Sequence, residues 1–253
     1  MSWIGAGIGA GIGAVIGGPI GAGIGGWLGN SIGNAFEQVQ RTGTMGHFNM
    51  NKEEAQSVFV VALFSMLAKM AKADGRVDES EVALITRLAR TEFKMDEEDQ
   101  KSAKVIFNNA LEDQFTVYDY AKQYRQIAGS AQMCEMVYRL LFSVAYADGE
   151  LHHDEDAILQ EIPSHLGLGQ SYYRLIKEEF QGKTVDIEAS YQVLGCEPSA
   201  NDAEIKRAYH QLCKDYHPDT IASKGLPEGF TKYAEQQMHL INDAYQTIKK
   251  KRK

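Results

Sequence analysis

Apolar and polar positions alternate in two different ways along this chain. From Ile4 to Gly33, isoleucine or leucine recurs at every fourth position, and glycine follows it each time. Further along, apolar residues recur at the three-to-four-residue spacing of amphipathic helices, with few prolines until a Pro-containing corner near the carboxyl end. The pattern predicts an all-α protein with these parts: a glycine-zipper helix at 1–33, a linker at 34–52, a helical bundle at 53–181 and a helical hairpin at 187–253.

The amino-terminal repeat has the spacing of a glycine zipper, in which glycines let helix backbones approach closely in lipid. No charged side chain occurs before Glu37, and the repeat is longer than the about 20 residues that cross a bilayer. We expect one membrane-spanning helix, kinked at Gly17-Gly18-Pro19, although a re-entrant hairpin or a soluble low-complexity tail is compatible with the same residues. The predicted oligomerisation residues are Gly5, Gly9, Gly13, Gly17, Gly21, Gly25, Gly29 and Gly33.

The middle part contains an internal repeat. Lys72-Ala-Asp-Gly-Arg-Val-Asp-Glu-Ser-Glu81 matches Tyr146-Ala-Asp-Gly-Glu-Leu-His-His-Asp-Glu155, and each string lies between apolar helical patterns. This A-D-G-x-[VL]-x-x-x-E pair resembles the TerB domain, first known from tellurite-resistance proteins. Helices are expected near 53–73, 78–93, 96–111, 117–128, 130–146, 153–164 and 170–181.

The same strings mimic the second half of a calcium-binding EF-hand loop, but the acidic first half is missing. His152 and His153, with Asp148 and Asp154, have the side chains to hold a transition metal. Solvated loops with helix-capping acids explain these residues more simply. We therefore assign no metal site.

The carboxy-terminal part contains the tripeptide His217-Pro218-Asp219. Pro218 fixes its own φ and disfavours a helical His217, so the preceding helix should end near Tyr216. Asn201 and Glu204 have the spacing of a capping box at the start of that helix. The pattern therefore predicts a rigid corner, carrying an imidazole and a carboxylate, between two helices.

The strings Y-x-V-L-G, I-K-R-A-Y-x-x-L, Y-H-P-D and I-N-D-A-Y between residues 191 and 245 closely resemble the J domain of DnaJ-type co-chaperones. The loop 222–228 is longer than in the commonest J domains, and a TerB domain ahead of a J domain is similar to the membrane-anchored, DjlA-type branch of the family. The resemblance implies binding to a DnaK-type chaperone and stimulation of its ATPase. The chaperone-binding residues that it implies are His217, Pro218, Asp219, Lys206, Arg207, His210 and Lys214.

The expected basic face is thinner than usual for the family, because His210 and Gln211 follow the A-Y pair where basic residues are common. An ordinary solvated helix face would carry the same charges. The basic run Lys249–Lys253 is compatible with contact to anionic lipid and equally with a soluble helix end.

Composition narrows the function. A net charge of −8 argues against general nucleic-acid binding. The three cysteines form no C-x-x-C pair, which excludes a zinc ribbon and fits a reducing compartment. The chain also lacks a nucleotide-binding loop and a nucleophile–base set, so we expect a non-enzyme without a cofactor.

The sequence thus predicts a single-pass protein of the inner (plasma) membrane with both globular domains in the cytoplasm, because a DnaK-type partner is cytosolic. We expect it to self-associate through its amino-terminal segment. The alternative is a TerB-type scaffold that senses stress or binds metal, with the J domain as an auxiliary dock. A structural glycine-zipper assembler is a third possibility.

Overall fold

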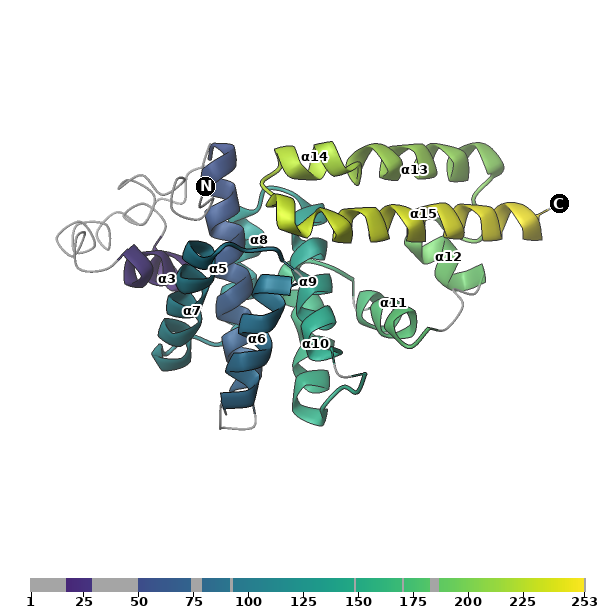
Figure 1. Cartoon of the computed structure of the whole chain (residues 1–253). Helices are drawn as coiled ribbons and strands as arrows, with labels where there is room; N and C mark the ends of the chain where they lie inside the picture. Colours follow the sequence, from purple (N-terminus) through teal and green to yellow (C-terminus); the bar gives the residue numbers. More distant parts are fainter. Residues whose placement is uncertain are drawn as a thin grey trace.

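The computed structural model describes residues 17–28, 50–73, 79–91, 93–147, 149–169, 171–182 and 187–252. Within these ranges every regular element is a helix, which confirms the predicted all-α fold (Figure 1). We call residues 50–182 the TerB-like domain and residues 187–252 the J-like domain.

The TerB-like domain is built around one central helix, α5 (Lys52–Ala71), which is buried on nearly all sides. Helices α7, α8 and α9 pack directly against it, which explains why its sequence is apolar all round. Its ends and those of the other helices lie within two residues of the expected ones: α6 (Glu79–Thr91), α7 (Glu97–Glu112), α8 (Val117–Ile127), α9 (Ala131–Ala145), α10 (His153–Leu166) and α11 (Ser171–Phe180).

Among the described helices, α5 is also the one long and apolar enough to cross a membrane, with a mean hydropathy of 1.4. Its most apolar window is 72% buried inside the protein. Its composition is therefore explained by its place at the centre of the bundle.

Local capping fixes the start of α5. The Asn51 side chain accepts from the backbone N–H of Glu54, and the Glu54 carboxylate accepts from the backbone N–H of Asn51. This capping box makes α5 begin at the end of the predicted linker. Most of that linker lies outside the described residues.

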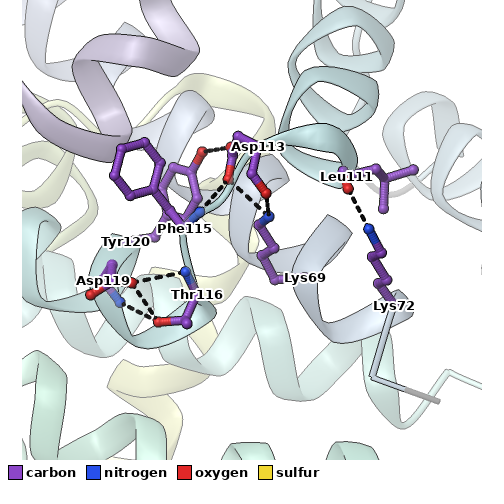
Figure 2. Close-up of polar contacts among 8 residues, drawn as sticks. All are labelled: Lys69, Lys72, Leu111, Asp113, Phe115, Thr116, Asp119 and Tyr120. Carbon is purple, nitrogen blue, oxygen red and sulfur yellow. Dashed lines mark hydrogen bonds and ion pairs between the residues drawn. The ribbon is translucent and has the colours of Figure 1, made fainter. Parts of the chain in front are cut away.

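The turn between α7 and α8 is tied to the carboxyl end of α5 (Figure 2). Lys69 Nζ lies 2.9 Å from Asp113 Oδ1, and Lys72 Nζ donates to the carbonyl oxygen of Leu111 at 2.7 Å. The Tyr120 hydroxyl donates to Asp113 Oδ2. These bonds satisfy carbonyls at the end of α7 and hold α7 and α8 against α5.

Part of the glycine repeat forms helix α3 (Gly18–Leu28), which packs on α5, α7 and α8. Ile20 and Ile24 are fully buried there. The Gln123 side chain binds the amino-terminal end of α3, accepting from the backbone N–H of Ile20 at 2.6 Å. At Gly23, an added Cβ would lie 2.8 Å from Val61 Cγ1, so glycine permits this close approach.

Of the predicted oligomerisation glycines, the described ones are Gly17, Gly21 and Gly25; the others, Gly5, Gly9, Gly13, Gly29 and Gly33, lie outside the described residues. Helix α3 begins at Gly18, which has a φ of +73°, in the segment where a kink was expected. Membrane crossing and self-association stay predictions.

In the J-like domain, α13 (Asp202–Asp215) and α15 (Thr231–Lys251) lie side by side (Figure 1). The Tyr209 and Tyr245 rings stack between them with centroids 4.1 Å apart, and the Tyr209 hydroxyl donates to Asn242 Oδ1 at 2.8 Å. The elements are α12 (Ile187–Val193), α13 (Asp202–Asp215), α14 (Pro218–Ser223), a 3₁₀ helix η2 (Glu228–Phe230) and α15 (Thr231–Lys251).

The loop expected at residues 222–228 is shorter in the structure, because α14 extends to Ser223 and η2 begins at Glu228. Pro218 occupies the first turn of α14, a position that suits its fixed φ and missing N–H, and a 3₁₀ turn follows. The stretch after the corner is therefore largely ordered in helical turns.

The basic carboxyl end is partly structural. Arg252 donates to the Tyr191 hydroxyl at 2.7 Å, to Asp202 Oδ1 at 2.8 Å and to the carbonyl oxygen of Pro198 at 2.9 Å. The last helix is thereby fastened to the turn that precedes α13.

Candidate functional site: the exposed corner of the J-like domain

The His217–Asp219 corner is rigid and open to solvent. His217 caps α14, and its Nδ1 accepts from the backbone N–H of Asp219 at 3.3 Å. The imidazole Nδ1 lies 3.8 Å from Asp219 Oδ2, and the two side chains are 56% and 94% exposed. Both ionisable groups are therefore free to contact another molecule, in a geometry fixed by Pro218.

The predicted basic residues form one exposed face of α13. At 100° per residue, Lys206, Arg207, His210 and Lys214 fall within an arc of about 100°, and all four side chains are exposed. The buried Ile205 lies on the opposite face, toward α15. The capping box predicted for Asn201 and Glu204 is present and fixes the start of this helix.

The residue that precedes the corner is anchored to the other domain. Tyr216 is 2% exposed, and its hydroxyl donates to Glu135 Oε2 on α9. The Tyr172 hydroxyl on α11 donates to the same oxygen at 3.2 Å. Burial raises the pKa of Glu135, although the two phenol donors and the charge of Arg139 oppose the rise.

The residues that follow the corner are anchored as well. Ile221 is fully buried, and Lys224 Nζ donates to Gln132 Oε1 on α9 at 3.0 Å. An added Cβ at Gly225 would lie 2.5 Å from the Cβ of Ala55 on α5. The corner thus projects between two segments that both lie on the TerB-like domain.

An aromatic cluster joins the two domains beyond the corner. The fully buried Phe230 ring lies 5.3 Å from that of Phe59 and 4.6 Å from that of Phe93, measured between centroids. Phe59 and Phe93 both belong to the TerB-like domain, so this cluster crosses from one domain to the other.

A buried cation completes the contact. Arg139 on α9 is 2% exposed. Its Nη atoms donate to both carboxylate oxygens of Glu179 on α11, at 3.1 and 2.6 Å. Its Nε donates to Gln237 Oε1 on α15 at 2.5 Å. Burial raises the pKa of Glu179, and the neighbouring guanidinium opposes the rise.

Glu135 and Arg139 were not identified from the sequence. The available signal was two charges four residues apart within the otherwise apolar run of α9. Charges inside a buried helix usually have polar partners, which points to polar side chains packed against that face.

The candidate metal residues are not gathered into a site among the described parts of the chain, where no group of three His, Cys, Asp or Glu side chains is placed to hold an ion. His152 occupies the N-cap position of α10 without a side-chain capping hydrogen bond, His153 is the first residue of that helix, and Asp148 lies outside the described residues. Cys134 is buried, and Cys196 and Cys213 are half-buried free thiols.

Comparison with known proteins identifies both domains. The family described as tellurite resistance protein TerB matches residues 60–178, and the DnaJ domain family matches residues 189–253. No solved structure matches this chain.

Three relatives, each named "Co-chaperone protein DjlA", match most of the chain. That of Photobacterium profundum is 32% identical over 243 residues, 86% of this chain and 87% of the relative. That of Shewanella oneidensis is 30% identical, covering 78% and 79%, and that of Escherichia coli K12 is 26% identical, covering 80% and 82%. The chain therefore belongs to the DjlA family of DnaJ-type co-chaperones, with a TerB domain followed by a J domain.

Proposed function

We propose that this protein is a membrane-anchored co-chaperone that binds a DnaK-type chaperone through α13 and the His217–Asp219 corner and stimulates its ATP hydrolysis. The observation that carries the proposal is the corner itself, which holds an exposed imidazole and carboxylate beside an exposed basic helix face. In this proposal the TerB domain proper spans 53–181 and the J domain, with its basic tail, spans 187–253.

The basic face of α13 attracts the chaperone and orients it on the J-like domain. Lys206, Arg207 and Lys214 are exposed cations with room to move, and charges of this kind chiefly raise the association rate and exclude like-charged partners. The face would therefore meet an acidic surface of the chaperone. His210 is an exposed imidazole on the same face.

The His217–Asp219 corner is the part that stimulates the ATPase of the bound chaperone. A DnaK-type ATPase with two conformations responds to any ligand that binds one of them better. A small rigid corner with fixed charges can provide that difference in affinity without chemistry of its own. No group of the J-like domain needs to touch the nucleotide.

The decisive test is steady-state ATP hydrolysis by the host's DnaK-type chaperone with the full-length protein in detergent micelles. His217→Gln should abolish the stimulation and leave the helical content unchanged. His239→Gln replaces an exposed histidine on α15 and serves as the matched control. Undiminished stimulation by the His217→Gln protein would refute the role given to the corner.

We further propose that residues 1–33 anchor the protein in the inner membrane as a single span that associates through its glycines, with both domains in the cytoplasm. In that state Gly18–Leu28 would leave its place against α5, α7 and α8 and enter the bilayer. The long uncharged glycine repeat supports this, since lipid forces such a stretch to satisfy its own backbone hydrogen bonds.

An exchange of anchors tests the self-association. Replacing the repeat by an unrelated single span should retain co-chaperone activity if tethering alone is needed. Loss of activity with that anchor, and also with Gly13, Gly17 and Gly21 replaced by leucine, would mean that the glycine contacts themselves are required.

A further inference from the structure

The J-like domain does not hang free from the TerB-like domain. The surface that contacts the TerB-like domain is made by Tyr216, the turn around Gly225 and Gly229, the Phe230 ring and one side of α15. The exposed basic face of α13 and the corner itself remain outside this contact. The surface expected to meet the chaperone and the surface that docks on the TerB-like domain are therefore separate.

The docking contacts lie on both sides of the corner in the sequence. On one side, Tyr216 donates to Glu135. On the other side, Lys224 donates to Gln132, and Gly225 lies against Ala55. The stretch from the corner to Phe230 is thus the part of the J-like domain that the TerB-like domain holds.

From this arrangement we propose that the TerB-like domain is an intramolecular clamp that fixes the orientation of the His217–Asp219 corner, with Glu135 as a positioning residue acting through Tyr216. The inference rests on the proposed stimulation of a DnaK-type ATPase and adds a role for the TerB-like domain in it. It also separates two steps. The basic face of α13 determines how tightly the chaperone binds, whereas the clamp determines the fraction of molecules in which the corner has the orientation that stimulates the ATPase.

Gly229 offers a selective way to open the clamp. A Cβ added there would lie 1.9 Å from the backbone carbonyl oxygen of Phe93, and each of the nearest atoms it would meet belongs to Phe93, in the TerB-like domain. The backbone of Gly229 is not in the left-handed region, so alanine suits the J-like domain itself. Gly229→Ala should therefore separate the two domains without unfolding either.

The first experiment uses the full-length chain in micelles and measures two quantities for Gly229→Ala. Amide hydrogen exchange in residues 216–230 should become faster, because the segment loses its support. In a titration of chaperone ATPase, the maximal stimulation should fall by at least about fivefold, the factor for one lost net hydrogen bond, because separation of the domains breaks the Tyr216–Glu135 bond together with other contacts. The half-saturating concentration should stay unchanged, since the basic face of α13 is intact. Glu228→Ala introduces the same residue at a neighbouring exposed position and should match the wild-type protein.

A second set of variants tests Glu135 itself. Tyr216→Phe keeps the buried ring but removes the hydroxyl donor, and Glu135→Leu removes the acceptor. Both should lower maximal stimulation as Gly229→Ala does. Glu135→Gln keeps an oxygen that accepts from the phenols and should restore near-native stimulation, a rescue that a general loss of stability would not produce.

The outcomes separate the two levels of the proposal. If the wild-type protein gives no stimulation, the proposed function fails and the clamp fails with it. If the wild-type protein stimulates and Gly229→Ala speeds exchange without lowering stimulation, the clamp alone is refuted. Unchanged exchange in Gly229→Ala would likewise overturn it, because the TerB-like domain would then not be holding the corner.

Discussion

Replacing Arg139 by methionine tests the buried cation that lies where the two domains meet. Arg139 has the largest of the fully buried side chains and links three helices, through Glu179 on α11 and Gln237 on α15. Methionine has similar length and is apolar, so it fills much of the same space. The perturbation is therefore chiefly the loss of one buried charge and its hydrogen bonds.

The structure sets the expected magnitude. Removing one partner of a buried ion pair costs about 3–5 kcal/mol, because the other charge is left unpaired. The Glu179 side chain keeps 27% of its exposure and retains some hydration. The loss should therefore lie at the lower end, about 3 kcal/mol, and it includes the unsatisfied amide oxygen of Gln237.

The free energy of unfolding can be measured by urea titration of the full-length protein in micelles, followed by circular dichroism. Arg174→Met, at an exposed position of α11, is the matched control and should change stability by less than about 0.5 kcal/mol. Arg139→Met combined with Glu179→Met should recover most of the loss, since no charge is then left unpaired.

The effect should also depend on pH. Desolvation raises the pKa of Glu179, and removal of Arg139 takes away the charge that opposes this rise. A raised folded-state pKa means that protonation favours the folded state, so the loss caused by Arg139→Met should shrink as the pH falls toward 4.5, the ordinary value for this carboxyl. A loss below about 1 kcal/mol at pH 7, or one that grows on acidification, would refute the reasoning.

Three further predictions concern other parts of the chain. Gly23→Leu should release α3 from the TerB-like domain and speed amide exchange in α3, because the added Cβ would lie 2.8 Å from Val61 Cγ1. Ala22→Leu, at an exposed position, should not release α3, and equal release by both variants would contradict the explanation. Asn201→Ala should lower the free energy of unfolding by about 1 kcal/mol in urea titrations, because it removes a capping box. Burial raises the pKa of Glu135, so its protonation stabilises the fold below its ordinary value of 4.5, and this contribution is lost as the pH rises through the folded-state pKa. Glu135→Gln should remove that part of the pH dependence of stability, and an unchanged profile would exclude Glu135 as its source.

The sequence was sufficient for features that depend on local signals. The ends of α13 follow from Asn201 with Glu204 at one end and from Pro218 shortly after the other, and both signals lie within a few residues of the boundary they set. The apolar periodicity gave the helices of the TerB-like domain to within two residues. The exposure of the His217–Asp219 corner follows from the same local chemistry.

The contact between the domains could not be predicted in this way. Gly229 appears in the sequence as an ordinary loop glycine, and only the carbonyl oxygen of Phe93 shows why a side chain is excluded there. Tyr216 fits the apolar face of α13 by spacing, but its hydroxyl bonds to Glu135, far away in the sequence. Periodicity identifies which face of a helix is buried and does not identify the partner that buries it.

The hydrogen bonds that Arg252 makes to Tyr191, Asp202 and Pro198 change how the basic carboxyl terminus should be studied. A truncation designed to ask whether this end attracts acidic phospholipids would also remove a guanidinium that lies over the Tyr191 ring and bonds to Asp202. Loss of activity in such a shortened protein would not show whether attraction to lipid was lost or whether α15 was no longer held against α12 and the start of α13. Charge reversal at Lys249 and Lys250, with Arg252 retained, separates the two effects. A purification tag added after the last residue retains Arg252 and its hydrogen bonds, whereas a chain that ends at Ile248 lacks them.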